Sequence, residues 1–186
     1  MNSTIYIKLN RLNDHKAVQH FCDAMSTQGE WLNETVYRID VNETQRLQFN
    51  LSLASFEEDM GSSVSAVVGF NEDQLMFIAL EAAQRYSMGR IIDLDALLLL
   101  SVWHKDLSLI QTTQLILNSV SSELIDTLKM YLLTGNNAIL ASEHLYLHRN
   151  TFNYRLNKFV DKTRINVRNP HIAQFLSMYY VLIERI

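Results

Sequence analysis

The side chains best suited to binding chemistry are concentrated in one short stretch near the C-terminal end. Residues 148–168 hold six Lys and Arg against Asp161 alone, although the whole chain has a net charge of −4. Arg and Asn form paired hydrogen bonds with base edges in the major groove, Thr offers a hydroxyl and a methyl group, and Arg and Lys pair with phosphates. Because the rest of the chain is acidic, any polyanion site must be local. The candidate side chains are Arg149, Asn150, Thr151, Asn153, Tyr154, Arg155, Asn157 and Lys158.

Two short helices joined by a sharp turn are expected to position this cluster. Gly135 is suited to end one helix and Asn136 or Asn137 to cap the next, which we expect to bury Ile139, Leu140 and Leu145. A tight turn at residues 146–148 then leads into a second helix, whose apolar stripe consists of Phe152, Leu156, Phe159 and Val160. Helix, turn and polar second helix make a helix-turn-helix. From the residues alone, a plain helical hairpin with a solvated basic face is an equally good interpretation.

The first hundred residues mix strand and helix patterns. Strands are expected at residues 4–9 and 62–70, helices at 13–29 and 71–89, and a hairpin at 34–53 whose turn is Asn42-Glu43-Thr44. Asn71 is the expected cap of the second of these helices. This order predicts an α+β domain, a small antiparallel sheet with helices on one face.

From Leu94 onward the patterns are helical. We divide the chain into an α+β domain (1–100), a helical linker (101–121) and an all-α helix-turn-helix domain (122–186). Pro170 is placed to open the last helix. That helix carries more apolar side chains than a small domain needs, which suggests a homodimer interface through Ile172, Phe175, Leu176, Tyr179, Tyr180, Leu182 and Ile183.

Other chemistry is poorly supported. The single cysteine, Cys22, lies in an apolar pattern typical of a buried thiol, and His15 and His20 do not share a helix face. His144 and His148 are separated by the predicted turn, and the acidic run at 56–59 suits a solvated loop better than a catalytic pair. We therefore expect no metal, no cofactor and no catalytic residue. With no signal peptide and no apolar run long enough for a bilayer, we expect a cytoplasmic protein without a membrane partner.

The C-terminal region also resembles a known family. The run "LYLHRNTFNYRLNKF", with its flanking helices over residues 122–186, is similar to the C-terminal helix-turn-helix of PucR/CdaR-type regulators of purine and sugar-diacid catabolism. It also resembles the DNA-binding end of the factor for inversion stimulation. This resemblance implies that His148, Arg149, Asn150 and Thr151 face bases, and that Tyr154, Arg155 and Lys158 hold the DNA backbone. Asn153 lies where that family often has a basic residue.

The upstream part resembles, more faintly, the degenerate diguanylate-cyclase-like (GGDEF-like) domain that precedes this unit in many members of the family. The segment "SVSAVVGFNEDQLMFIALEAAQRYSMGRIIDLDALLLL" carries the likeness. Where a working cyclase has Gly-Gly-Asp-Glu-Phe in a hairpin, this chain has Asp40-Val41-Asn42-Glu43, and the sequence contains no Gly-Gly pair. The resemblance therefore implies a non-enzymatic domain.

Together these patterns predict a sequence-specific transcription regulator that binds double-stranded DNA as a homodimer, with a small-molecule effector as a possible further partner. Two alternatives stay open. In the first, the α+β domain is an enzyme or binds a nucleotide or another small ligand. In the second, the chain is a protein-interaction adaptor whose helix-turn-helix no longer binds DNA.

Overall fold

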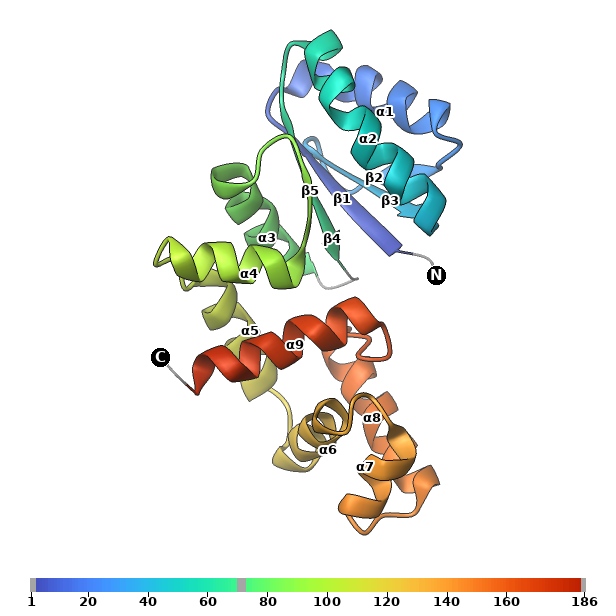
Figure 1. The fold of residues 1–186 in the computed structure, drawn as a ribbon, viewed down its shortest axis with the longest axis vertical. Helices are drawn as coiled ribbons and strands as arrows, with labels where there is room; N and C mark the ends of the chain where they lie inside the picture. Colours follow the sequence, from blue (N-terminus) through green and yellow to red (C-terminus); the bar gives the residue numbers. More distant parts are fainter. Residues whose placement is uncertain (1–2, 70–72, 185–186) are drawn as a thin grey trace.

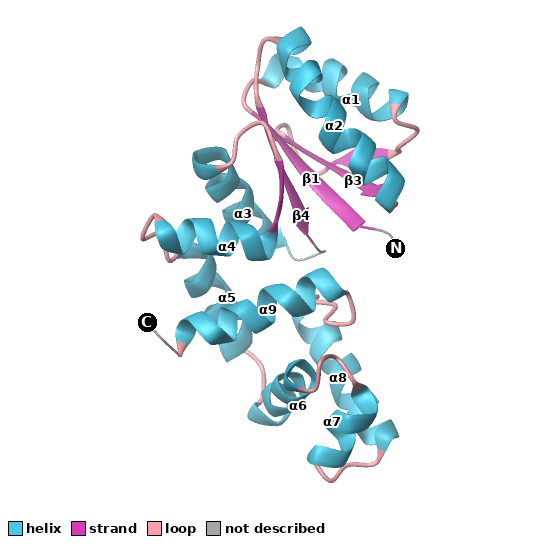
Figure 2. Cartoon of the chain, in the orientation of Figure 1, coloured by secondary structure: helices cyan, strands magenta, loops and turns pink. Residues whose placement is uncertain are grey.

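The computed structural model describes residues 3–69 and 73–184. A β-sheet with its helices forms one end of the elongated molecule, and a purely helical part forms the other (Figure 1). Figure 2 shows that the strands are confined to the N-terminal end. The predicted α+β part followed by an all-α part is confirmed.

The described sheet has five strands in the order β2-β3-β1-β4-β5. The central strand β1 pairs antiparallel with β3 on one side and with β4 on the other, and β2 extends the sheet beyond β3. The short edge strand β5 pairs parallel with β4, so the sheet is mixed rather than wholly antiparallel. The strands are β1 (Ser3–Leu9), β2 (Gly29–Trp31), β3 (Val36–Val41), β4 (Val64–Gly69) and β5 (Ile91–Asp93).

Helices cover both faces of the sheet, so the expectation of a single covered face was wrong. On β1, Ile5 and Ile7 pack in the cluster on the side of α1 (His15–Ala24) and α2 (Glu43–Met60). Tyr6 points to the opposite face and packs with α3. Both faces are buried because apolar residues follow one another in "IYI", a pattern typical of a strand covered on both sides. A short 3-10 helix (Leu12–Asp14) precedes α1, and α3 spans Asp73–Tyr86. The predicted cap Asn71 lies outside the described residues.

The predicted hairpin at residues 34–53 was also misplaced. The turn between antiparallel strands lies at residues 32–35, between β2 and β3, and α2 begins directly after β3. Asn42 caps α2: its side chain accepts from the Gln45 backbone N at 2.9 Å, and the Gln45 side chain accepts from the Asn42 backbone N at 3.0 Å. Apolar residues at 47, 49, 51 and 53 imitate strand alternation, but only Phe49 and Leu53, four residues apart, are buried.

Gly29, which we expected to end the first helix, is instead the first residue of β2. A Cβ atom at Gly29 would lie 2.3 Å from the backbone O of Arg38. The glycine is needed because the two strands approach closely at this point. The first helix therefore ends earlier, at Ala24.

The helical part has six described helices whose core is continuous with the α3 face of the sheet. One cluster of buried side chains runs from Val67 in β4 through Leu97 and Leu128 to Phe152 and Phe175. This core crosses residues 100 and 121, so the division into domain, linker and domain stays a prediction. The helices are α4 (Leu94–Trp103), α5 (Ser108–Asn118), α6 (Ser122–Leu133), α7 (Ala138–His144), α8 (Arg149–Thr163) and α9 (Pro170–Ile183), and Pro170 opens α9 as expected.

Candidate nucleic-acid interface

The α6 helix ends and the α7 helix begins at the residues that the sequence suggested. Gly135 adopts φ +63°, and Asn137 caps α7 by accepting from the backbone N of Ile139 at 3.0 Å. The expected burial was wrong for Ile139 and Leu140, which are 64% and 44% exposed, whereas Leu145 is partly buried against the core. This two-turn helix buries its small residues Ala141 and Ser142 instead, which allows its backbone to pack closely.

The turn between α7 and α8 lies at the end of the molecule farthest from the sheet (Figure 1). Tyr146 has φ +53°, and its backbone N donates to Glu143 O at 3.0 Å. Leu147 N donates to Ser142 O at 2.9 Å, so the end of α7 is closed by a pair of bonds typical of a left-handed helix cap. His148 then caps α8, with its Nδ1 accepting from Asn150 N at 3.3 Å.

The two faces of α8 have opposite character. Phe152, Leu156 and Phe159 are at most 1% exposed and pack into the core, as predicted. The other face is exposed to solvent, and most of the candidate side chains lie on it or at the start of the helix: His148, Arg149, Asn150, Thr151, Asn153, Tyr154 and Lys158. The packing of α6 and α7 on the buried stripe fixes which face of α8 is presented.

Arg155 differs from the other candidate cations. Its Nε lies 2.5 Å from Oε1 of Glu123 on α6, and its side chain is only 25% exposed. This ion pair neutralises Arg155 and ties α6 to α8. Lys158, in contrast, is exposed, with its Nζ 5.9 Å from the centre of the Tyr154 ring. Among the candidate cations on α8, Arg149 and Lys158 are therefore the two with free charge in the described structure.

Three cations outside the predicted site belong to the same region, and one of them, Lys162, lies in the last turn of α8. The other two, Arg164 and Arg168, follow α8 and contribute to the local positive charge, but they are not among the predicted site residues. Both are exposed. The alternation of apolar and polar residues from 164 to 168 is the sequence signal that could have identified them.

Other candidate chemistry finds little support in the described residues. They contain no group of three His, Cys, Asp or Glu side chains arranged to hold a metal ion. Burial raises the pKa of the Cys22 thiol to about 12. None of the described helices combines the length and the apolarity needed to cross a bilayer.

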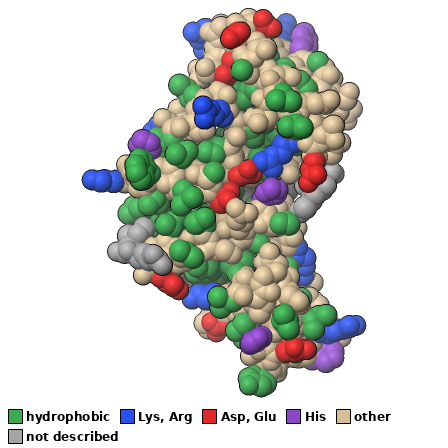
Figure 3. Space-filling model, in the orientation of Figure 1, with side chains coloured by type: hydrophobic (Ala, Val, Ile, Leu, Met, Phe, Trp, Pro, Cys, Tyr) green, Lys and Arg blue, Asp and Glu red, His purple; other side chains and the backbone are tan. Residues whose placement is uncertain are grey.

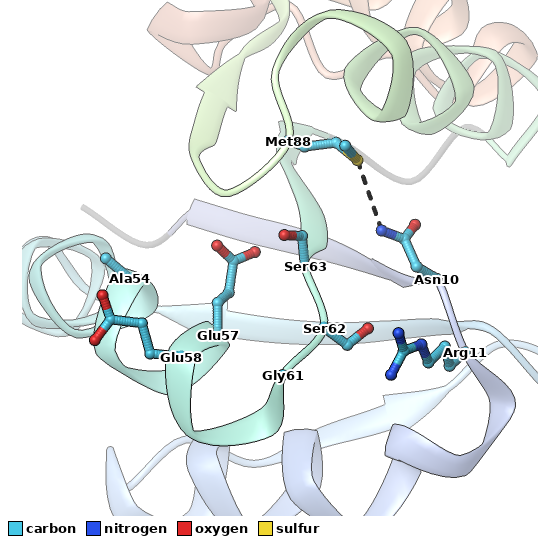
Figure 4. A pocket seen from close by; sticks show the side chains of 9 residues that line it. All are labelled: Asn10, Arg11, Ala54, Glu57, Glu58, Gly61, Ser62, Ser63 and Met88. Carbon is cyan, nitrogen blue, oxygen red and sulfur yellow. Dashed lines mark hydrogen bonds between the residues drawn. The ribbon is translucent and has the colours of Figure 1, made fainter.

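An open depression of about 560 Å³ lies in the α+β part, between the ends of β1 and α2 (Figure 4). Arg11, Glu57 and Glu58 line it. The Glu57 carboxylate accepts from Val64 N at 2.7 Å, and Asn10 donates to Met88 Sδ at 3.6 Å. Several of its polar groups are thus satisfied within the protein, and the depression does not identify a ligand.

Most of the apolar surface of α9 is used inside the chain. Ile172, Phe175, Leu176 and Tyr179 are at most 2% exposed, and α9 packs along α4. Most of the residues predicted to form a subunit interface are therefore buried within the chain and cannot contact a second copy. Hydrophobic side chains nevertheless gather on the surface over α4 and α9 (Figure 3). The exposed large apolar residues of these two helices are Leu99 and Trp103 on α4, at 45% and 83%, and Val181 on α9, at 51%.

Comparison with known proteins gives a family match that contains α7 and α8. Residues 124–178 match the family described as the PucR C-terminal helix-turn-helix domain. A segment of 63 residues is 32% identical to the uncharacterized protein YxkF of Bacillus subtilis, and one of 64 residues is 36% identical to the proline-responsive transcriptional activator PutR of the same bacterium. Each segment is 34% of this chain, but only 20% of YxkF and 15% of PutR. The chain thus matches a small part of either relative.

A solved structure, a regulator of polyketide synthase expression from Bifidobacterium adolescentis, aligns with the whole chain and with 82% of its own length, with a TM-score of 0.46 and 14% sequence identity.

Proposed function

We propose that this chain is a transcription regulator that reads double-stranded DNA in a sequence-specific way, with α8 in the major groove. The observation that carries the proposal is the exposed polar and basic face of α8, opposite the stripe of Phe152, Leu156 and Phe159. The match of residues 124–178 to a PucR helix-turn-helix supports it, as does the description of PutR as a transcriptional activator. A DNA partner also implies a cytoplasmic location.

The candidate side chains divide into two roles. His148, Arg149, Asn150 and Thr151 stand at the start of α8, the end of a second helix that contacts base edges in helix-turn-helix proteins. Tyr154 and Lys158 lie further along and suit phosphates, and Asn153 lies beside them. Because Arg155 is paired with Glu123, we assign it a smaller part in DNA binding than its charge alone suggests.

A titration of purified variants tests this proposal. Arg149→Ala is expected to cost about 1 to 3 kcal/mol on the preferred site and to relax discrimination at one base pair. Lys158→Ala is expected to weaken specific and random DNA alike and to reduce the salt slope by about one. The preferred site is first selected from random duplexes with the wild-type protein. Unchanged affinity in both folded variants would mean that the basic face is only solvated, and the proposal would fall.

We also propose that the DNA-binding unit is a homodimer. Two helix-turn-helix units related by a two-fold axis read half-sites about 34 Å apart, which gives more base contacts than one unit. We assign the contact with the second copy to Leu99 and Trp103, which are exposed four residues apart on α4, because apolar patches at the surface can mark an interface. Light scattering of the protein, free and on its selected site, tests this, with Trp103→Glu as the disruptive variant. A monomer under both conditions would rule the dimer out.

The upstream residues complete the proposal. We infer that the α+β part is a degenerate cyclase-like domain without catalytic activity. The β2–β3 hairpin is the turn to compare with a cyclase, and its residues 32–35 read Leu-Asn-Glu-Thr. They lack a glycine pair, as do residues 40–43.

A further inference from the structure

The loop that joins α8 to α9 presents a second set of cations beside α8. Exposure alternates along it: Ile165 and Val167 are fully buried, whereas Arg164, Asn166 and Arg168 are exposed. The two buried side chains anchor the loop backbone in the core. The polar side chains on either side of them and between them, Arg164, Asn166 and Arg168, therefore face solvent.

Hydrogen bonds hold this loop in one conformation. Arg164 N donates to Val160 O at 2.7 Å, and Asn169 N donates to Asn166 O at 3.0 Å. Asn166 also accepts from Arg168 N through its side chain, at 3.2 Å. A surface that is ordered before binding loses less conformational entropy when a ligand arrives. These hydrogen bonds favour one loop conformation, which suits a binding element.

The guanidinium of Arg168 is positioned without being neutralised. Its Nη2 donates to the side-chain Oδ1 of Asn157 on α8 at 2.7 Å. Asn157 is a neutral amide, in contrast to Glu123, which neutralises Arg155. A guanidinium has five N–H donors, so most of them stay available to an anion. Neither Arg164 nor Arg168 forms an ion pair within the described residues.

The position of Arg168 fits the edge of the groove that α8 would enter. Asn157 follows Asn150 by seven residues, which places it on the same side of α8, about 10 Å further along the helix axis. The major groove is about 12 Å wide. If α8 enters the groove with its N-terminal end first, a cation held at Asn157 lies about 10 Å behind the end that meets the bases, at the depth of the phosphate backbone.

We propose that Arg164, Asn166 and Arg168 form a phosphate-binding element that contacts the DNA backbone beside α8. Arg168 makes the principal contact, Arg164 adds a second cation, and Asn157 is the positioning residue that aims Arg168. This inference rests on the proposed DNA binding by α8. It extends the contact surface beyond the helix to residues that follow it.

The test uses the full chain and fluorescence anisotropy with the selected duplex and a random one, at two or more salt concentrations. Arg168→Gln is expected to weaken both duplexes by roughly eightfold at 0.1 M salt and to reduce the salt slope by about one. Arg164→Gln is expected to act in the same direction, and Asn157→Ala to lower affinity less, with the slope unchanged because the charge remains. Lys16→Gln, which removes an exposed charge from α1 at the other end of the molecule, is the matched control and is expected to bind like wild type.

DNA in which one phosphate group is replaced by an uncharged group can locate the phosphate that Arg168 contacts. Duplexes that carry one methylphosphonate at successive positions are titrated with wild type and with Arg168→Gln. We expect one position at which the neutral group weakens wild type but does not weaken the variant further. If Arg164→Gln and Arg168→Gln bind like wild type while Arg149→Ala and Lys158→Ala lose affinity, the loop has no such role and the proposed function stands. If none of the four loses affinity, both ideas are overturned.

Discussion

Nε of Arg155 on α8 lies 2.5 Å from Oε1 of Glu123 on α6, so a cation that the sequence assigned to DNA is already paired within the protein. The pair is partly exposed, at 25% for Arg155 and 55% for Glu123. Ion pairs of this kind usually contribute at most about 1 kcal/mol to stability. Its larger effect is on the charge that α8 presents.

Glu123→Gln should therefore strengthen DNA binding. The substitution removes the charge that neutralises Arg155, so affinity for random duplex should rise and the salt slope should steepen, while stability falls by about 1 kcal/mol or less. Binding titrations and urea unfolding measure the two effects. Glu58→Gln makes the same change of net charge on α2 and should have little effect. Equal gains from both variants would point to net charge rather than to Arg155.

Phe152→Ala should unfold the helix-turn-helix without touching its polar face. The Phe152 ring is fully buried, and removing such a ring usually costs about 3 to 5 kcal/mol. DNA binding should be lost together with helical circular dichroism on mild heating. Tyr154→Ala, on the exposed face, is the comparison and should keep its stability. A stable Phe152→Ala protein would contradict the packing of α8.

Tyr146→Gly should stabilise the protein. Tyr146 holds a left-handed backbone conformation with φ +53°, which costs an L-residue roughly 1 to 2 kcal/mol, and its ring is 97% exposed and contributes little packing. The greater freedom of glycine in the unfolded chain offsets part of the gain, so we expect a net rise of up to about 1 kcal/mol. Tyr146→Ala removes the ring but keeps a Cβ and should show no such rise. Denaturant unfolding of the two variants checks the difference.

Cys22 should be unreactive until the α+β part unfolds. Burial raises the pKa of its thiol to about 12, so the folded protein has almost no thiolate at pH 8 and should not react with an alkylating reagent. In the unfolded chain the pKa is near 9, its ordinary value. Above about pH 9 the unfolded state therefore loses a proton that the folded state keeps, and stability should decline as pH rises toward 12. Cys22→Ala should remove that part of the alkaline decline, and rapid alkylation of native protein at pH 8 would contradict the burial.

The protein should form no cyclic dinucleotide from GTP with Mg²⁺ or Mn²⁺. The β2–β3 turn has no glycine to let the backbone approach a triphosphate, and Asn33 Oδ1 already accepts from the backbone N atoms of Thr35 and Val36, at 2.9 and 3.0 Å. Chromatography of the reaction mixture, with an active cyclase in parallel, measures this. Product above the background of a heat-inactivated sample would show that the turn is catalytically competent.

The sequence alone determined those features that depend on neighbours a few residues apart. The stripe of Phe152, Leu156 and Phe159 follows from helical spacing, and the Asn137 cap from a short polar side chain before an apolar helix. The strand at β1 follows from β-branched and aromatic residues in succession. Such short-range preferences act before the chain is folded, so they can be read without a structure.

The tertiary structure decided what depends on partners distant in the chain. Residues 47–53 alternate like a strand, but they become helix α2 because the Asn42 cap and the packing of Phe49 and Leu53 on the sheet outweigh local alternation. On α7 the close approach of helices favours burial of Ala141 over that of the larger Ile139. Likewise, no spacing rule reveals that Arg155 contacts a carboxylate and Arg168 an amide. In the sequence the two residues are equivalent cations. Only the packing of α6 against α8, and of the following loop beside it, determines which of these cations is neutralised and which stays free.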